Sequence, residues 1–99
     1  MNEKTVVEVL QKARALISKP ENWCQHVSKQ RNNTGAMSYC AMGAVNEASR
    51  WHPEIHPACV LALRDAGGFS PIMTIPKYND THTHAEVLAL FDKAIAANK

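Results

Sequence analysis

The stretch YNDTHTHAEVLALFDKAI, residues 78–95, contains the clearest helix start in this 99-residue chain. Thr83 followed three residues later by Glu86 is the capping-box pattern, in which each side chain bonds the backbone amide of the other residue. Apolar residues then recur at helical spacing along one face: Val87, Leu90 or Phe91, Ala94 and Ile95. We therefore predict an amphipathic helix that begins after Thr83 and buries this face.

A similar start occurs near the other end of the chain, in TVVEVLQKARALI at residues 5–17. Thr5 and Glu8 form a second capping box, and the apolar residues that follow again share one helical stripe: Val6, Leu10, Ala13 and Ile17. Capping boxes arise independently, so the likeness does not indicate a duplication. It predicts two similar amphipathic helices that bracket the rest of the chain.

A helix of small residues is predicted between them, in YCAMGAVNEASRW at residues 39–51. Ser38 is its expected N-cap, and one stripe would hold Cys40, Ala44, Ala48 and Trp51. A glycine inside a helix costs about 1 kcal/mol relative to alanine. We therefore expect a neighbouring backbone to pack against Gly43.

A third helix is predicted from Pro57, a favourable first-turn residue, to the stop signal Gly67–Gly68. Residues 21–37 lack a helical period and predict a long loop or irregular hairpin. Residues 69–80 are interrupted by two prolines and predict extended chain, with at most one short strand around Ile72–Ile75. The predicted fold is therefore all-α: a compact single domain, residues 1–99, of about four helices with at most one short strand pair.

Composition excludes several classes of protein. The chain is 45% hydrophobic and 20% charged, which argues against disorder, and its net charge of +2 is too small to indicate nucleic-acid binding. No apolar run approaches the roughly 18 residues of a membrane span, and the N-terminal sequence lacks the basic start of an export signal. We therefore expect a cytoplasmic protein whose cysteines (Cys24, Cys40 and Cys59) are free thiols.

Two polar segments are the candidate binding site. Asn79 and Asp80 are expected in a turn that braces the entry to the last helix, and Trp23 is the natural anchor of the long loop. If the loop at residues 22–36 meets the turn at residues 78–84, a polar cluster would form from Trp23, Gln25, His26, Asn79, Asp80 and His82. The basic residues Lys29 and Arg31 could instead meet an acidic partner.

A cysteine nucleophile is the alternative. Cys40 lies near a predicted helix start, where the helix dipole favours a thiolate, and His82 with Asn79 or Asp80 could complete a catalytic arrangement. On the buried stripe, however, Cys40 would simply be a small hydrophobe. The histidine spacings suit no set of three or four metal ligands, so we expect no metal and no other cofactor.

Several segments together resemble a small domain family of unknown function found in bacteria and their phages: ARALI, NWCQ, YCAMGAVNEA and YNDTHTHAEVLALFDKAI. The family pattern places Trp-Cys at Trp23–Cys24, Cys-Ala-x-Gly-Ala at residues 40–44, Asn-Asp at Asn79–Asp80, and Thr-x-x-Glu-Val-Leu at residues 83–88. The resemblance implies a mostly helical fold and a phage or prophage context, with no established reaction.

The expected function is therefore non-enzymatic binding of a host protein or a small polar ligand. An inhibitor that counters host defences is one form that this function could take. The alternative is a small cysteine-dependent hydrolase or transferase built on Cys40. Nucleic acid is not the expected partner, and the sequence leaves the oligomeric state open.

Overall fold

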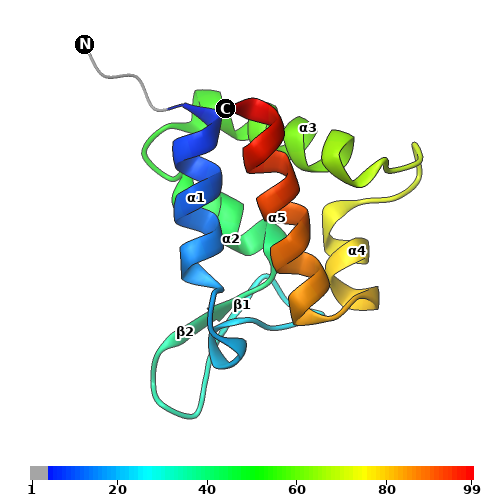
Figure 1. The fold of residues 1–99 in the computed structure, drawn as a ribbon. Coiled ribbons are helices and arrows are strands. Elements are labelled where there is room, and N and C mark those ends of the chain that lie inside the picture. The colour runs from blue at the N-terminus through cyan, green and yellow to red at the C-terminus, as the bar shows by residue number, and fades with distance from the viewer. Residues whose placement is uncertain (1–4) are drawn as a thin grey trace.

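Five α-helices and one two-stranded antiparallel sheet make up the fold of residues 5–99, the part of the chain that this computed structural model describes; residues 1–4 of the predicted domain lie outside that part. In chain order the elements are α1 (Val6–Leu16), β1 (Lys29–Arg31), β2 (Met37–Tyr39), α2 (Ala41–Ala48), α3 (His56–Gly67), α4 (Ile75–Thr81) and α5 (His84–Asn98), with short 3₁₀ turns at Pro20–Asn22 and Pro53–Ile55. The first and last helices lie side by side and antiparallel, α3 crosses one end, and the hairpin closes the other (Figure 1).

Both predicted capping boxes are present. The backbone amide of Thr5 donates to Glu8 Oε1 over 3.0 Å, and the amide of Glu8 donates to Thr5 Oγ1 over 3.1 Å. The same pair of bonds joins Thr83 and Glu86 over 2.8 and 3.2 Å. Local chemistry therefore fixes the starts of α1 and α5, the two helices whose apolar faces build most of the core.

The core lies where α1, α2, α3 and α5 meet. Phe91 of α5 and Leu10 of α1 are among its largest fully buried side chains, and Ala13, Ala44 and Ala94 let the helices approach closely. At the edge of the core, the Arg14 guanidinium bonds the Asp92 carboxylate. The Cα radius of gyration, 12.6 Å, matches a compact single domain of this length.

Gly43 is required by a close backbone approach, as the sequence suggested. A Cβ atom at this position would lie 1.9 Å from the carbonyl oxygen of Ser28. That same oxygen accepts a hydrogen bond from the Cys40 amide over 3.0 Å. Gly43 therefore lets the loop before β1 pack directly onto the first turn of α2.

The prediction of about four helices was wrong by one, because residues 75–81 form α4 instead of extended chain. Thr74 caps this helix by accepting the Lys77 amide, and Pro76 occupies the first turn, where its missing N–H is not needed. Asn79 and Asp80 consequently lie in a helix and not in a turn. The short strand pair lies in the long loop, so the segment from Ile72 to Ile75 contributes no strand.

The second predicted helix is shorter than expected. Ser38 lies buried in β2, and the N-cap is Cys40, whose Sγ accepts the Gly43 amide over 3.3 Å. Because α2 ends at Ala48, Trp51 lies in the following turn and is 77% exposed. The placement of Trp51 on a buried stripe was therefore wrong.

The three cysteines are free thiols, as predicted, and all three are buried. None of the helices in the described range has the length and apolarity that a membrane crossing requires.

Candidate functional site

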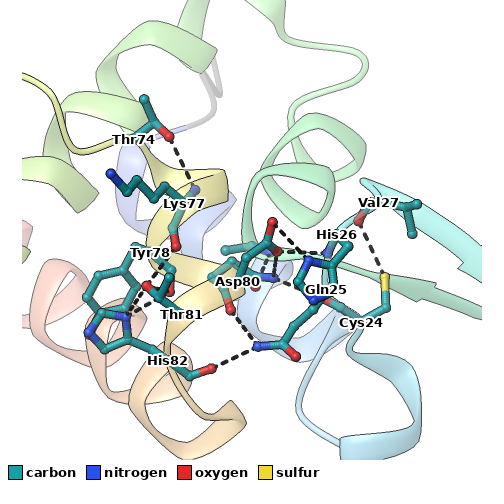
Figure 2. Close-up of polar contacts among 12 residues, drawn as sticks. Cys24, Gln25, His26, Val27, Thr74, Lys77, Tyr78, Asp80, Thr81 and His82 are labelled. Atoms are coloured by element: carbon teal, nitrogen blue, oxygen red, sulfur yellow. Dashed lines mark hydrogen bonds and ion pairs between the residues drawn. The ribbon is translucent and has the colours of Figure 1, made fainter.

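The long loop contacts the C-terminal end of α4, so the two polar segments of the predicted cluster lie together (Figure 2). Gln25 Nε2 donates to the backbone oxygens of Asn79 and His82, each over 3.1 Å. The His26 amide donates to Asp80 Oδ1 over 2.8 Å. Side chains more than fifty positions apart in the sequence therefore form one network.

Asn79 is the centre of this network and is completely buried. Its Oδ1 accepts hydrogen bonds from Trp23 Nε1 over 2.7 Å and from the Ala41 amide over 2.9 Å. Its Nδ2 donates to the Cys24 carbonyl over 2.9 Å. With its polar atoms used inside the protein, Asn79 clamps the loop, α2 and α4 together and is not free to hold a ligand.

His82 also has a local role. Its ring stacks on Tyr78 with 3.7 Å between the ring centroids, and its Nδ1 lies 2.8 Å from the Tyr78 carbonyl oxygen. The cavity that Cys40 borders is lined by Asp80 but not by His82. The predicted grouping of Cys40, His82 and Asp80 therefore stays a prediction, because His82 is absent from the lining of the cavity that the other two residues share.

In this cavity the histidine that lies with Cys40 and Asp80 is His26 and not the predicted His82. Together with Cys40 and Asp80 it lines a cavity of about 140 Å³, whose remaining walls are Val27, Ser28, Met42 and Pro76. Its Nδ1 lies 3.7 Å from Asp80 Oδ2. At φ 72° it is also the one non-glycine residue in the described range with a positive φ, a conformation that side chains rarely adopt and that is often found at functional sites.

The titratable groups around this cavity differ in charge state. The hydrogen bond from the His26 backbone amide lowers the pKa of Asp80, with burial acting in the opposite direction and the Asn79 side chain assisting. Burial raises the pKa of Cys24, and the neighbouring charges of Cys40 and Asp80 raise it further. At neutral pH the site therefore contains an Asp80 carboxylate beside a protonated Cys24 thiol.

The basic residues of the predicted site form no hydrogen bond with Asn79 or Asp80. Lys29 and Arg31 are exposed on β1, and Arg31 shares a surface depression with Trp23. A depression of about 300 Å³ lies between the hairpin and α2. Its lining residues are Ser28, Lys29, Tyr39, Gly43, Asn46, Glu47 and Arg50. At one end, the guanidinium of Arg50 lies 5.3 Å from the centre of the exposed Trp51 ring.

Arg50 and Trp51 were missed as site residues because the helical stripe was extended too far. The signal that could have found them is the His52–Pro53 pair, since the residue before a proline is disfavoured in a helix. A helix that ends earlier leaves both side chains in a turn, where they are available to a partner.

In the described range, no three or more His, Cys, Asp or Glu side chains are grouped so that they could hold a metal ion.

Comparison with known proteins identifies a family for this chain but no activity. No curated protein and no solved structure matches the chain. The resemblance seen in the sequence is nevertheless confirmed at the level of the family, with a match over residues 1–97. The chain belongs to a family of unknown function, DUF6197.

Proposed function

We propose that the protein acts by binding a partner protein through the surface formed by the hairpin and the C-terminal end of α2. We call Lys29, Tyr39, Arg50 and Trp51 the basic aromatic face; Arg31 follows two residues after Lys29 on β1. The proposal rests on Trp51, whose side chain is 77% exposed and lies directly beside Arg50.

Residue type favours a protein partner. Tryptophan, tyrosine and arginine are enriched in protein interfaces and in their hot spots, where large aromatic side chains bury much area at low entropic cost. Trp51, Arg50 and Tyr39 bring all three types to one depression and its rim. A partner that covers Trp51 would remove a large apolar surface from water.

Charge favours an acidic partner. Lys29, Arg31 and Arg50 are cationic, and the depression contains one acid, Glu47, whose carboxylate lies 3.6 Å from Arg50. Opposite potentials across an interface accelerate association and select the partner. The whole chain carries only +2, so an acidic patch on a protein fits better than the continuous charge of a nucleic acid.

The polar cluster is not the surface we propose. Asn79 and Gln25 use their side chains to tie protein segments together, which leaves a small polar ligand few free groups. The resemblance to a family that occurs in phages suggests a bacterial host protein as the partner. A counter-defence inhibitor is the form this would take if the partner belongs to host immunity.

The test begins with affinity capture from a lysate of a bacterium that carries this chain, followed by titration of the purified partner. Trp51→Ser should weaken binding about 30-fold, which corresponds to a hot spot of about 2 kcal/mol. Ile72→Ser is the matched control, because Ile72 is 81% exposed and lies outside the face.

Charge is tested in the same assay. Lys29→Glu should weaken partner binding, and a higher salt concentration should weaken binding by the wild-type protein. Lys77→Glu, at an exposed position of α4, should have little effect. Equal retention of the partner by Trp51→Ser and Ile72→Ser would overturn the proposal. Capture of nucleic acid alone would overturn it as well.

A further inference from the structure

Three chemically active side chains, Cys40, His26 and Asp80, line one small cavity between α2, α4 and the long loop. We propose that they form a reactive thiol site that accepts a short acyl group on Cys40. This inference concerns a different cavity from the depression that Lys29 and Arg50 line, and it does not rest on the proposed binding function.

Cys40 supplies the nucleophile. Its sulfur occupies the N-cap of α2 and accepts the Gly43 amide over 3.3 Å. Amide groups at a helix start stabilise negative charge that develops near them during a reaction. The cavity borders this sulfur-bearing residue, although Cys40 is otherwise buried.

His26 supplies the acid and base, and Asp80 positions it. One carboxylate oxygen of Asp80 holds the His26 backbone at 2.8 Å, and the other lies 3.7 Å from the ring atom Nδ1 (Figure 2). The first contact holds the backbone at its positive φ, and the second places the exposed ring beside the Asp80 carboxylate. A carboxylate, a histidine and a thiol that line one cavity are the groups that a cysteine nucleophile with its general base requires.

The proposed step is an acyl transfer from an activated ester or thioester. The Cys40 proton passes to His26 Nε2 as the sulfur bonds the carbonyl carbon. The bond from that carbon to the leaving group then breaks, and the leaving group takes the proton from His26. The product is a thioester on Cys40, and the neutral leaving group departs.

The cavity limits the size of the acyl group. Its volume of about 140 Å³ compares with roughly 30 Å³ for one water molecule in the liquid. Val27, Met42 and Pro76 give it apolar walls. An acyl group of two or three carbons fits inside such a space, whereas a six-carbon chain would fill it or extend out of its mouth.

The experiment exposes the purified full chain to p-nitrophenyl acetate and maps the acetylated cysteines by peptide mass spectrometry over time. Cys40 should be acetylated at least tenfold faster than Cys59, which is fully buried and whose pKa burial raises to about 11. The p-nitrophenyl hexanoate should react with Cys40 at least tenfold more slowly than the acetate.

Variants of His26 test the acid and base role without disturbing the backbone. His26→Asn should slow Cys40 acetylation at least tenfold, since general acid–base catalysis contributes more than this, and asparagine tolerates the positive φ. His26→Gly also tolerates this φ, and millimolar imidazole should restore part of its rate. His52→Asn, outside the cavity, should leave the rate unchanged.

Two results would overturn the proposal. One is a Cys40 rate equal to that of Cys59 in the wild type, because this means that acetylation waits for unfolding. The other is a rate that both His26 variants leave unchanged. Circular dichroism of each variant establishes that it is folded, and imidazole rescue of His26→Gly provides a readout that a merely destabilised protein would not show.

Discussion

Replacement of Asn79 by alanine should destabilise the fold by about 3–5 kcal/mol. The change removes the partner of the Ala41 amide and of the Cys24 carbonyl, both buried, and of the half-buried Trp23 indole. Each buried polar group left without a partner costs about 1–3 kcal/mol. The indole can turn partly toward water, so we assign most of the loss to the two backbone groups.

Urea unfolding followed by tryptophan fluorescence measures this loss. Trp51 is exposed and would add a constant background, so Trp51→Phe is the suitable reference protein. In that background, Trp23→Phe removes a single donor to Asn79 and also the last tryptophan of the chain, so its urea unfolding is followed by circular dichroism. It should be destabilising by about 1–2 kcal/mol. An Asn79→Ala loss below about 1 kcal/mol would refute the view that Asn79 clamps three segments.

Three further outcomes follow from contacts elsewhere. Gly43→Ala should destabilise by about 2–4 kcal/mol in the same urea assay despite its better helix propensity, because the new Cβ displaces the Ser28 carbonyl; a stabilised variant would contradict the close approach. Thr83→Ala should lower the thermal midpoint through loss of about 1 kcal/mol of capping, whereas Thr83→Ser should not. Backbone hydrogen bonds lower the pKa values of Asp80 and Glu86 from the ordinary 3.8 and 4.5. The unfolded chain therefore binds protons first, so the free energy of unfolding should be steady above about pH 5 and fall as the pH drops through 4, with a shallower fall in Asp80→Asn.

Elements that local chemistry determines were predictable from the sequence. Thr5 with Glu8, and Thr83 with Glu86, bond within one helical turn, so their sequence spacing suffices to predict them. The need for a glycine at position 43 also followed, because an unfavourable residue inside a helix indicates a neighbour that approaches closely. The identity of that neighbour, Ser28, depended on tertiary packing.

Helix α4 was missed because two prolines were taken to exclude a helix. Pro76 in fact lies in the first turn, where proline is well tolerated, and Thr74 provides the cap. The pattern Thr-Ile-Pro could have indicated a helix start. The error matters for the site, because a helix and not a turn presents Asn79 to the core.

The candidate site was only partly predictable for a different reason. The polar residues of both segments were recognised, but their pairing joins positions more than fifty residues apart, which no local pattern encodes. His82 was named as the catalytic histidine because it lies in the same segment as Asp80. In the fold its ring stacks on Tyr78, whereas His26 reaches Asp80 across the contact between the loop and α4.

The contacts of Asn79 also allow the thiol site and the partner-binding surface to be tested independently of each other. Asn79 bonds the Cys24 carbonyl, the Ala41 amide and, over 3.3 Å, Asp80 Oδ1, so it holds the walls of the thiol cavity. Asn79 forms no direct hydrogen bond with the four residues of the basic aromatic face; its partners Trp23 and Cys24 pair with the backbone of Tyr39. In Asn79→Ala, studied at low temperature where the protein remains folded, Cys40 acetylation should therefore fall while affinity for the partner persists. Parallel loss of both properties in the folded variant would contradict their independence, since it would mean that the clamp also shapes the partner-binding surface.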